Sequence, residues 1–113
     1  MVSATAPLPA SHGAITMRES TIENYLVERV KDLGGEVRKV KWIGRNGAPD
    51  RIVMLPEYRT AFAQDSETIW IELKAPGEKC KPHQTREHDR MRKMGQRVEV
   101  IDSIEGVDEV LAC

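Results

Sequence analysis

Apolar residues recur along the chain at two spacings, one typical of helices and one typical of strands. Between Met17 and Leu33 they lie three or four positions apart, which predicts a first helix ending at Gly34-Gly35. A second helix is predicted from Pro82 to Met94, because proline suits the first position of a helix. Residues 104–111 predict a short third helix.

Four other segments alternate between apolar and polar residues, or are short and apolar, and predict strands. These segments are residues 36–42, 50–55, 69–74 and 98–101. Short links join the first three, which can form a meander, whereas the fourth follows a helix and can add parallel to the sheet. The expected fold class is α/β, a mixed sheet flanked by helices in the order αβββαβ, followed by a short C-terminal helix.

The length of 113 residues suits one domain, and 40% hydrophobic with 31% charged residues is a globular composition. Residues 1–15 are small, proline-containing and aperiodic, so we expect a flexible arm followed by one folded domain over residues 16–113. No apolar run is long enough for a signal peptide or a membrane span. Two distant cysteines favour a reducing compartment, and a cytoplasmic protein is expected.

The formal net charge of -1 conceals two basic segments. Residues 29–51 and residues 77–97 each hold seven Lys/Arg against three Asp/Glu. Such segments suit contact with a polyanion, although ordinary solvated surfaces have the same composition.

The strongest candidate chemistry combines Asp50 with Glu72 and Lys74. Alternation over residues 69–74 places Glu72 and Lys74 on the same face of their strand. Asp50 follows Pro49 at the start of another strand; an isolated Pro-Asp often only forms a turn, but a second carboxylate nearby makes a site the better interpretation. Carboxylate oxygens suit a hard cation, Mg²⁺ or Mn²⁺, and the Lys74 amine can orient water or stabilise charge on a phosphate.

Two helical positions can extend this set. Glu23 lies within the apolar arc of the first helix, and Glu19 lies one turn earlier on the same face. Each also fits a capping box, with Ser20 or Thr16 as the N-cap, and could simply close the helix start; Glu23 is the preferred site residue. Gln84 lies on the inner face of the second helix near its N-terminus, where a surface glutamine is the plainer interpretation.

A zinc site built on Cys80, His83 and His88 is disfavoured, because a fourth ligand is missing and the three residues straddle a helix start.

With the motifs assembled, residues 17–111 resemble the virus-type replication-repair nuclease (VRR-NUC) branch of the PD-(D/E)xK nuclease superfamily. The matching pieces are the acidic helix ending in Gly34-Gly35, Gly47-x-Pro49-Asp50-Arg51, Glu72-Leu73-Lys74-Ala75-Pro76-Gly77, Gln84 and Gly95-Gln96-Arg97-Val98-Glu99-Val100.

The resemblance implies a restriction-endonuclease-like fold and a Mg²⁺- or Mn²⁺-dependent deoxyribonuclease with no organic cofactor. It implies that Asp50, Glu72 and the backbone carbonyl of Leu73 bind the metal, and that Lys74 positions the attacking water. Glu23 would complete the acidic cluster through a water molecule, and Gln84 would hold a water, a ligand or the scissile strand. Family members often carry Ser or Thr where Lys81 stands, which leaves the cap of the second helix open.

Small members of this branch, bacterial or phage-encoded, look like homodimeric nucleases of branched DNA, including four-way (Holliday) junctions, with roles in DNA repair. The near two-fold symmetry of a junction suits a dimer. A non-cleaving module that binds DNA branches is the alternative, and a plain partner-binding domain is a further one. Basic side chains expected at phosphates are Lys39, Lys41, Arg45, Lys79, Lys81, Arg86, Arg90 and Lys93.

Overall fold

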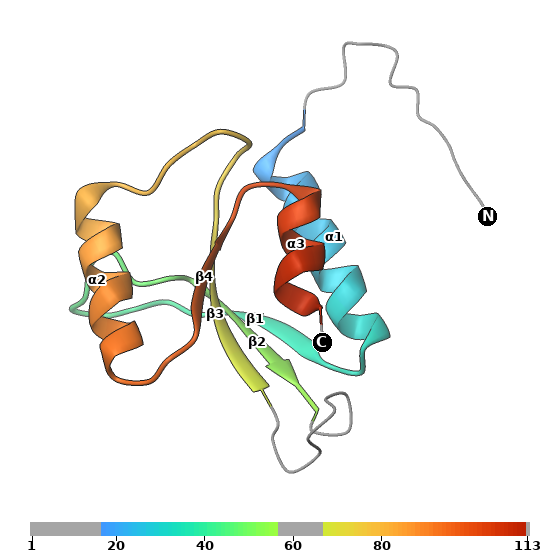
Figure 1. The fold of residues 1–113 in the computed structure, drawn as a ribbon, viewed down its shortest axis with the longest axis horizontal. Helices are drawn as coiled ribbons and strands as arrows, with labels where there is room; N and C mark the ends of the chain where they lie inside the picture. Colours follow the sequence, from blue (N-terminus) through green and yellow to red (C-terminus); the bar gives the residue numbers. More distant parts are fainter. Residues whose placement is uncertain (1–16, 57–66, 113) are drawn as a thin grey trace.

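The computed structural model describes residues 17–56 and 67–112. Within those ranges the elements follow the predicted order, with three helices and a four-stranded mixed sheet (Figure 1). The predicted arm, residues 1–15, lies outside the described residues. The elements are α1 (Glu19–Asp32), β1 (Glu36–Lys39), β2 (Arg51–Leu55), β3 (Glu67–Leu73), α2 (Pro82–Lys93), β4 (Val98–Ile101) and α3 (Ile104–Leu111).

The sheet has the order β1-β2-β3-β4. The first three strands pair antiparallel, and β4 pairs parallel with β3, so the predicted meander and crossover are confirmed. Helices α1 and α3 lie together on one side of the sheet, and α2 lies on the other (Figure 1). This arrangement matters for the chemistry, because the two faces of β3 meet different helices.

The apolar core forms between the sheet and the α1–α3 pair. Helix α1 buries residues four positions apart, which is one stripe of a helix, and the strands bury alternate residues facing that stripe. Tyr25 also donates a hydrogen bond of 2.8 Å to Asp108, which ties α1 to α3. The buried core residues include Ile22, Leu26, Val30, Val53, Leu55, Ile69, Ile71, Leu73, Ile101, Val107, Val110 and Leu111.

The two ends of α1 differ from one another in how they are closed. Arg18 is the N-cap and its side chain makes no capping bond, so the capping box that starts at Ser20 is wrong, because Ser20 lies inside the helix. The alternative start at Thr16 lies outside the described residues. At the other end Gly34 adopts φ +84°, and its N–H donates 2.9 Å to the carbonyl of Lys31, as expected of a glycine that ends a helix.

Two predicted boundaries need correction. The first strand ends at Lys39, three residues before the predicted end, because the chain turns away into the glycine-containing connection after Val40 donates its N–H to the Asp50 carbonyl at 2.9 Å. The second helix ends at Lys93, one residue before the predicted end, and Met94 is its C-cap and is 72% exposed. Helix α2 buries Glu87, His88 and Met91.

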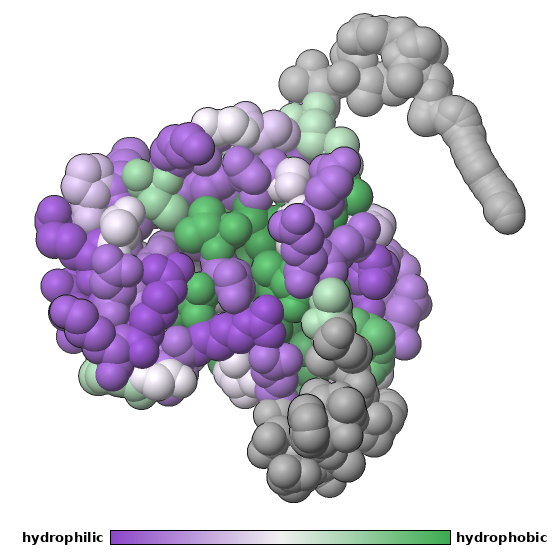
Figure 2. Space-filling model, in the orientation of Figure 1, coloured by the Kyte–Doolittle hydropathy of each residue, from purple (hydrophilic) through white to green (hydrophobic). Residues whose placement is uncertain are grey.

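Figure 2 shows hydrophilic side chains over the outer faces of the helices and apolar surface between α2 and the α1–α3 pair. Besides Met94, the exposed apolar side chains include Val100 of the edge strand β4, at 41%, and Ile43 in the connection between β1 and β2, at 92%. No helix within the described residues is both long enough and apolar enough to cross a lipid bilayer.

Candidate active site

The strand register brings Asp50 and Glu72 to the same face of the sheet. Arg51 is paired with Ile71 in the antiparallel ladder between β2 and β3. One step further along this ladder, Asp50 comes opposite Glu72, and side chains opposite one another share a face. That face is covered by α2, because Ile71 on the other face belongs to the core under α1 and α3. The register, extended by this one position, places the two carboxylates on the same side of the sheet, and their joint role stays a prediction.

Glu72 is buried, with 9% of its surface exposed, and three side chains approach its carboxylate. The Nε2 of Gln84 donates to Oε2 at 3.3 Å, and the Nζ of Lys74 lies 3.8 Å from the same oxygen. The Nε2 of His88 lies 3.6 Å from Oε1. Both carboxylate oxygens are thus approached by groups from β3 itself or from α2.

Gln84 connects the strand to the helix start. Its Oε1 accepts hydrogen bonds from the Lys74 Nζ at 3.0 Å and from the backbone N–H of Lys81 at 2.8 Å. The side chain of Lys81 makes no capping bond, so the Gln84 amide supplies the side-chain hydrogen bond at the start of α2 by accepting the N–H of the N-cap residue. Gln84 is therefore held in position from both sides and is not a solvated surface glutamine.

The charge state of Glu72 follows from its surroundings. Burial raises the pKa of Glu72 to about 7, Lys74 opposes that shift, and the negative charges of Asp50 and Glu19 add to it. Near neutral pH both the protonated and the ionised form of Glu72 are therefore populated. A cation near Asp50 and Glu72 would favour the ionised form, since opposite charge lowers the pKa of a carboxyl group.

Glu23 lies on the opposite face from Glu72. Its Oε2 accepts from the Nε of Arg51 at 2.7 Å, and this bond lowers the pKa of Glu23. The Nη1 of Arg51 lies 3.0 Å from Asp50 Oδ1, so the guanidinium links the two carboxylates. Glu19 is exposed at the start of α1, and its negative charge helps to raise the pKa of Glu72.

The described side chains near Glu72 offer a hard divalent cation two carboxylates and no third. Within residues 17–56 and 67–112, no three His, Cys, Asp or Glu side chains lie close enough together to hold a metal ion, which applies to the disfavoured zinc site at Cys80 and equally to a centre built on three carboxylates. Two facing carboxylates remain, with the backbone carbonyl of Leu73 between Glu72 and Lys74 in the sequence. Mg²⁺ is commonly bound by one or two carboxylates and completes its shell with water and substrate phosphate.

Three residues near the site were not predicted from the sequence. Arg51 is 7% exposed between Glu23 and Asp50, His88 is 1% exposed beside Glu72, and Glu87 is 4% exposed. His88 follows Gln84 by four positions and so shares its helix face, which is the one signal that could have assigned it to the site. Neither ring nitrogen of His88 has a hydrogen-bond partner within the described residues. Burial and the charge of Arg92 lower the pKa of His88, while the backbone of Gly47 acts in the opposite direction.

The predicted phosphate contacts separate into two groups. Lys39, Lys41 and Arg45 line a cavity of about 490 Å³ that Asp50 also borders. Along α2, Arg90 pairs with Glu87 at 2.8 Å, and Arg45 reaches the same carboxylate at 3.5 Å, so part of the positive charge there is neutralised. The others are exposed, namely Lys79, Lys81, Arg86 and Lys93.

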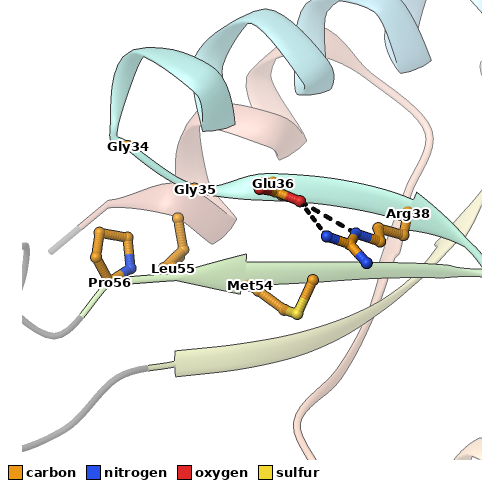
Figure 3. A pocket seen from close by; sticks show the side chains of 7 residues that line it. All are labelled: Gly34, Gly35, Glu36, Arg38, Met54, Leu55 and Pro56. Carbon is orange, nitrogen blue, oxygen red and sulfur yellow. Dashed lines mark hydrogen bonds and ion pairs between the residues drawn. The ribbon is translucent and has the colours of Figure 1, made fainter.

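A separate cavity of about 330 Å³ lies at the other end of β2, lined by residues that include Met54, Leu55 and Pro56 (Figure 3). Its charged lining residues, Glu36 and Arg38, are hydrogen-bonded to one another, with 3.1 Å from the Arg38 Nε to the Glu36 carboxylate. This cavity holds none of the predicted catalytic residues.

Comparison with known proteins identifies the family of the domain. No protein-family model matches the chain. The chain is 44% identical over 87 residues to the protein named "Putative nuclease p44" of the Acyrthosiphon pisum secondary endosymbiont phage 1, a match covering 77% of this chain and 85% of that relative. A solved structure described as a VRR_NUC domain superposes with a TM-score of 0.70 at 38% identity, covering 84% of this chain and 95% of the other. The chain belongs to the VRR-NUC family of nuclease domains.

Proposed function

We propose that this domain is a divalent-metal-dependent DNA endonuclease that hydrolyses phosphodiester bonds, with Mg²⁺ or Mn²⁺ as its cofactor. The observation that carries the proposal is the buried Glu72 carboxylate, which faces Asp50 across the strand ladder and lies within reach of Lys74 and Gln84. A buried carboxylate with a pKa near neutrality beside other acidic groups is costly for a fold, and such pKa shifts cluster at functional sites.

In this proposal Asp50 and Glu72, with the backbone carbonyl of Leu73, would hold the cation. When bound, the cation supplies a positive charge that polarises the phosphate. The Nζ of Lys74 stays near this centre because Gln84 accepts its hydrogen bond at 3.0 Å, and from there it can orient the attacking water or stabilise charge on the phosphate. Gln84 has a second task, since its Nε2 keeps the Glu72 carboxylate oriented.

The acidic cluster was expected to include Glu23, and that role stays a prediction. Glu19 is the second candidate, because its charge helps to raise the pKa of Glu72, whereas Glu23 is held by Arg51 on the other face of the sheet. Arg51 then has the task of orienting Asp50 through its Nη1.

The decisive experiment incubates the protein with labelled four-way junction, flap, single-stranded and duplex DNA in Mg²⁺ or Mn²⁺. Asp50→Asn and Glu72→Gln should each lower the rate by about a hundredfold or more, since the electrostatic contribution of such a metal is worth several kcal/mol. Glu105→Gln removes an exposed carboxylate on α3 and serves as the matched control. Undiminished cleavage by both site variants contradicts the metal assignment, and binding without cleavage by the parent protein favours the non-cleaving module.

The preferred substrate is proposed to be branched DNA such as four-way junctions, cut by a homodimer. The support is physical: a junction has near two-fold symmetry and needs two cuts, which two identical sites related by a dyad can make. Family membership supports nuclease activity, and the choice of branched DNA as the substrate belongs to this proposal.

A further inference from the structure

The groove beside Asp50 lies where β1 ends and the connection to β2 begins, and its volume is about 490 Å³. Asp50 therefore borders both this groove and the carboxylate pair of the proposed active site. A ligand that fills the groove would therefore reach the Asp50 side of the proposed active site. The lining residues are Lys39, Val40, Lys41, Trp42, Arg45, Asp50 and Arg51.

Two lysines in the groove have no close carboxylate partner among the described residues. Arg51 and Arg45 do have such partners, Glu23 at 2.7 Å and Glu87 at 3.5 Å. Within the part of the chain that the structure describes, no carboxylate lies at ion-pair distance from Lys39 or Lys41, and the charge of Lys39 acts on Glu23 only at longer range, where it helps to lower the pKa of that carboxyl group. Lys39 also stands opposite Arg51 in the strand ladder, where like charges destabilise one another. An anionic ligand would offset this repulsion.

Trp42 gives the groove a flat apolar wall. Its Nε1 donates to the carbonyl of Pro49 at 2.8 Å, and its ring packs against Trp70 with centroids 5.3 Å apart and planes tilted by 45°. The ring is therefore held in one orientation. The lysines alone could be explained as charges that keep an edge strand from pairing with other chains. The partly exposed ring of Trp42 does not serve that purpose. Aromatic and basic side chains together are what proteins use to bind unpaired nucleotides.

We infer that this groove binds an unpaired nucleotide next to the phosphodiester bond to be cleaved, with its phosphate against Lys39 and Lys41 and its base against Trp42. The position relative to the cleaved bond rests on the proposed function. A fully paired duplex must unstack a base before it can fill such a site, which costs free energy. The groove thus selects DNA with an unpaired nucleotide near the cut, as at a branch, a flap or a strand end.

Binding is measured by fluorescence anisotropy in EDTA with a labelled oligothymidine of about twelve nucleotides, a length within the range of single-strand sites. Lys41→Ala should weaken binding at least about fivefold and reduce the slope of log affinity against log salt by about 0.7. Lys31→Ala removes the same charge from the exposed end of α1 and should leave both quantities unchanged. Equal behaviour of the two variants overturns the inference.

Fluorescence tests the base contact separately. The chain has two tryptophans, so Trp70→Phe leaves Trp42 as the single emitter. Its emission should be quenched by the oligothymidine and not by a hairpin duplex of equal length. If Trp70→Phe fails to fold, the parent protein and Trp42→Phe give the same comparison, because the quenching should vanish in Trp42→Phe. Absent quenching, or equal quenching by duplex, contradicts a base site at Trp42.

These measurements are made without a divalent metal, so they do not depend on cleavage. If the protein cleaves no DNA but binds oligothymidine through Lys41, the proposed function is contradicted and the nucleotide site in the groove is supported. If the protein cleaves DNA normally but Lys41→Ala binds oligothymidine like the parent, the nucleotide site is contradicted and the proposed function is supported.

Discussion

At the scale of single residues, Glu72 is a carboxylate placed where ionisation is unfavourable. Desolvation is the main cause of its raised pKa, and Lys74 compensates only in part. Removing a carboxylate from water is costly unless it is paired, and the 3.8 Å separation from Lys74 is a loose pairing. The site therefore stores an unfavourable interaction that a cation or a proton can relieve.

The pH dependence of stability should reveal this cost. The pKa of Glu72 is about 7 in the folded protein and near its ordinary value of 4.5 in the unfolded chain, so the folded state binds more protons between those values. Stability attributable to Glu72 is therefore retained at low pH and lost as pH rises through about 7. We expect Glu72→Gln to be more stable than the parent by about 1–3 kcal/mol at pH 8, with the difference shrinking towards pH 5. Urea denaturation without metal at both pH values measures it; a difference independent of pH contradicts the raised pKa.

Substitutions of Glu19 and Glu23 should change different properties of the protein, the first cleavage and the second stability. Glu23→Gln leaves the buried Arg51 without its charged partner on α1, which should cost about 1–3 kcal/mol of unfolding free energy. Glu19→Gln removes an exposed carboxylate in the first turn of α1, so it should cost at most about 1 kcal/mol of stability and slow cleavage at least about tenfold. Denaturation curves and cleavage rates on the same preparations test both. Unchanged cleavage by Glu19→Gln, with cleavage abolished in a fully stable Glu23→Gln, would restore Glu23 as the site carboxylate.

Prediction of single residues was most successful where the periodicity of a strand or a helix determines which way a side chain points. Strand alternation placed Glu72 and Lys74 on one face, and helix position placed Gln84 at the inner start of α2, where it contacts both. The partner of Glu23 could not be predicted from the sequence, because the position of a residue around a helix gives the direction of its side chain but not the strand residue that it contacts. Arg51 reads as an ordinary charge after Asp50 until the ladder puts it on the core face opposite Ile71.

At the scale of elements, the connection between β1 and β2 packs against the first turn of α2. Gly47 has φ +86°, and a Cβ there would lie 2.8 Å from the carbonyl oxygen of His83 and 3.1 Å from the Cα of Gln84. This close approach is possible only without a side chain. The sequence predicted a glycine-rich link but not its contact with a helix more than thirty positions away, because turn composition contains no information about distant partners.

Gly47→Ala tests that contact, with Gly44→Ala as its control. Both glycines have positive φ, so each substitution pays the cost of a left-handed alanine, but a Cβ at Gly44 meets nothing within 4 Å. Gly47→Ala should therefore lose about 1–3 kcal/mol more stability than Gly44→Ala, and it should also slow cleavage because α2 and Gln84 shift. Chemical denaturation and cleavage assays on the pair measure the difference. Equal losses in both variants would show that the loop yields easily.

At the scale of the whole molecule, the sequence was sufficient for element order, strand pairing and fold class. Long periodic segments and short links leave few topologies, and the mixed sheet with a parallel β4 follows from the crossover through α2. Strand ends were less certain, as the early end of β1 shows, because pairing stops where the partner chain turns away. Family membership adds the nuclease activity, which the fold alone would not establish.

Oligomeric state belongs to this scale as well. A homodimer should elute with twice the mass of one chain in size-exclusion chromatography with light scattering, and cleavage of a four-way junction should then produce paired cuts on opposite strands. A monomer at all concentrations up to those of the cleavage assay, with junction cleavage retained, would contradict the dimer proposal.

The position of β3 between an antiparallel and a parallel neighbour has a consequence for folding fidelity. Shifting this strand by one residue would turn the ionic side chains of Glu72 and Lys74 into the apolar layer under α1 and expose Ile71 instead. Such misfolded pairings are strongly penalised, so the two charges that serve catalysis also reject wrong alignments during assembly. Replacing both by apolar residues of similar size would then give a domain that is no longer a nuclease and in which β3 is less strictly confined to one alignment.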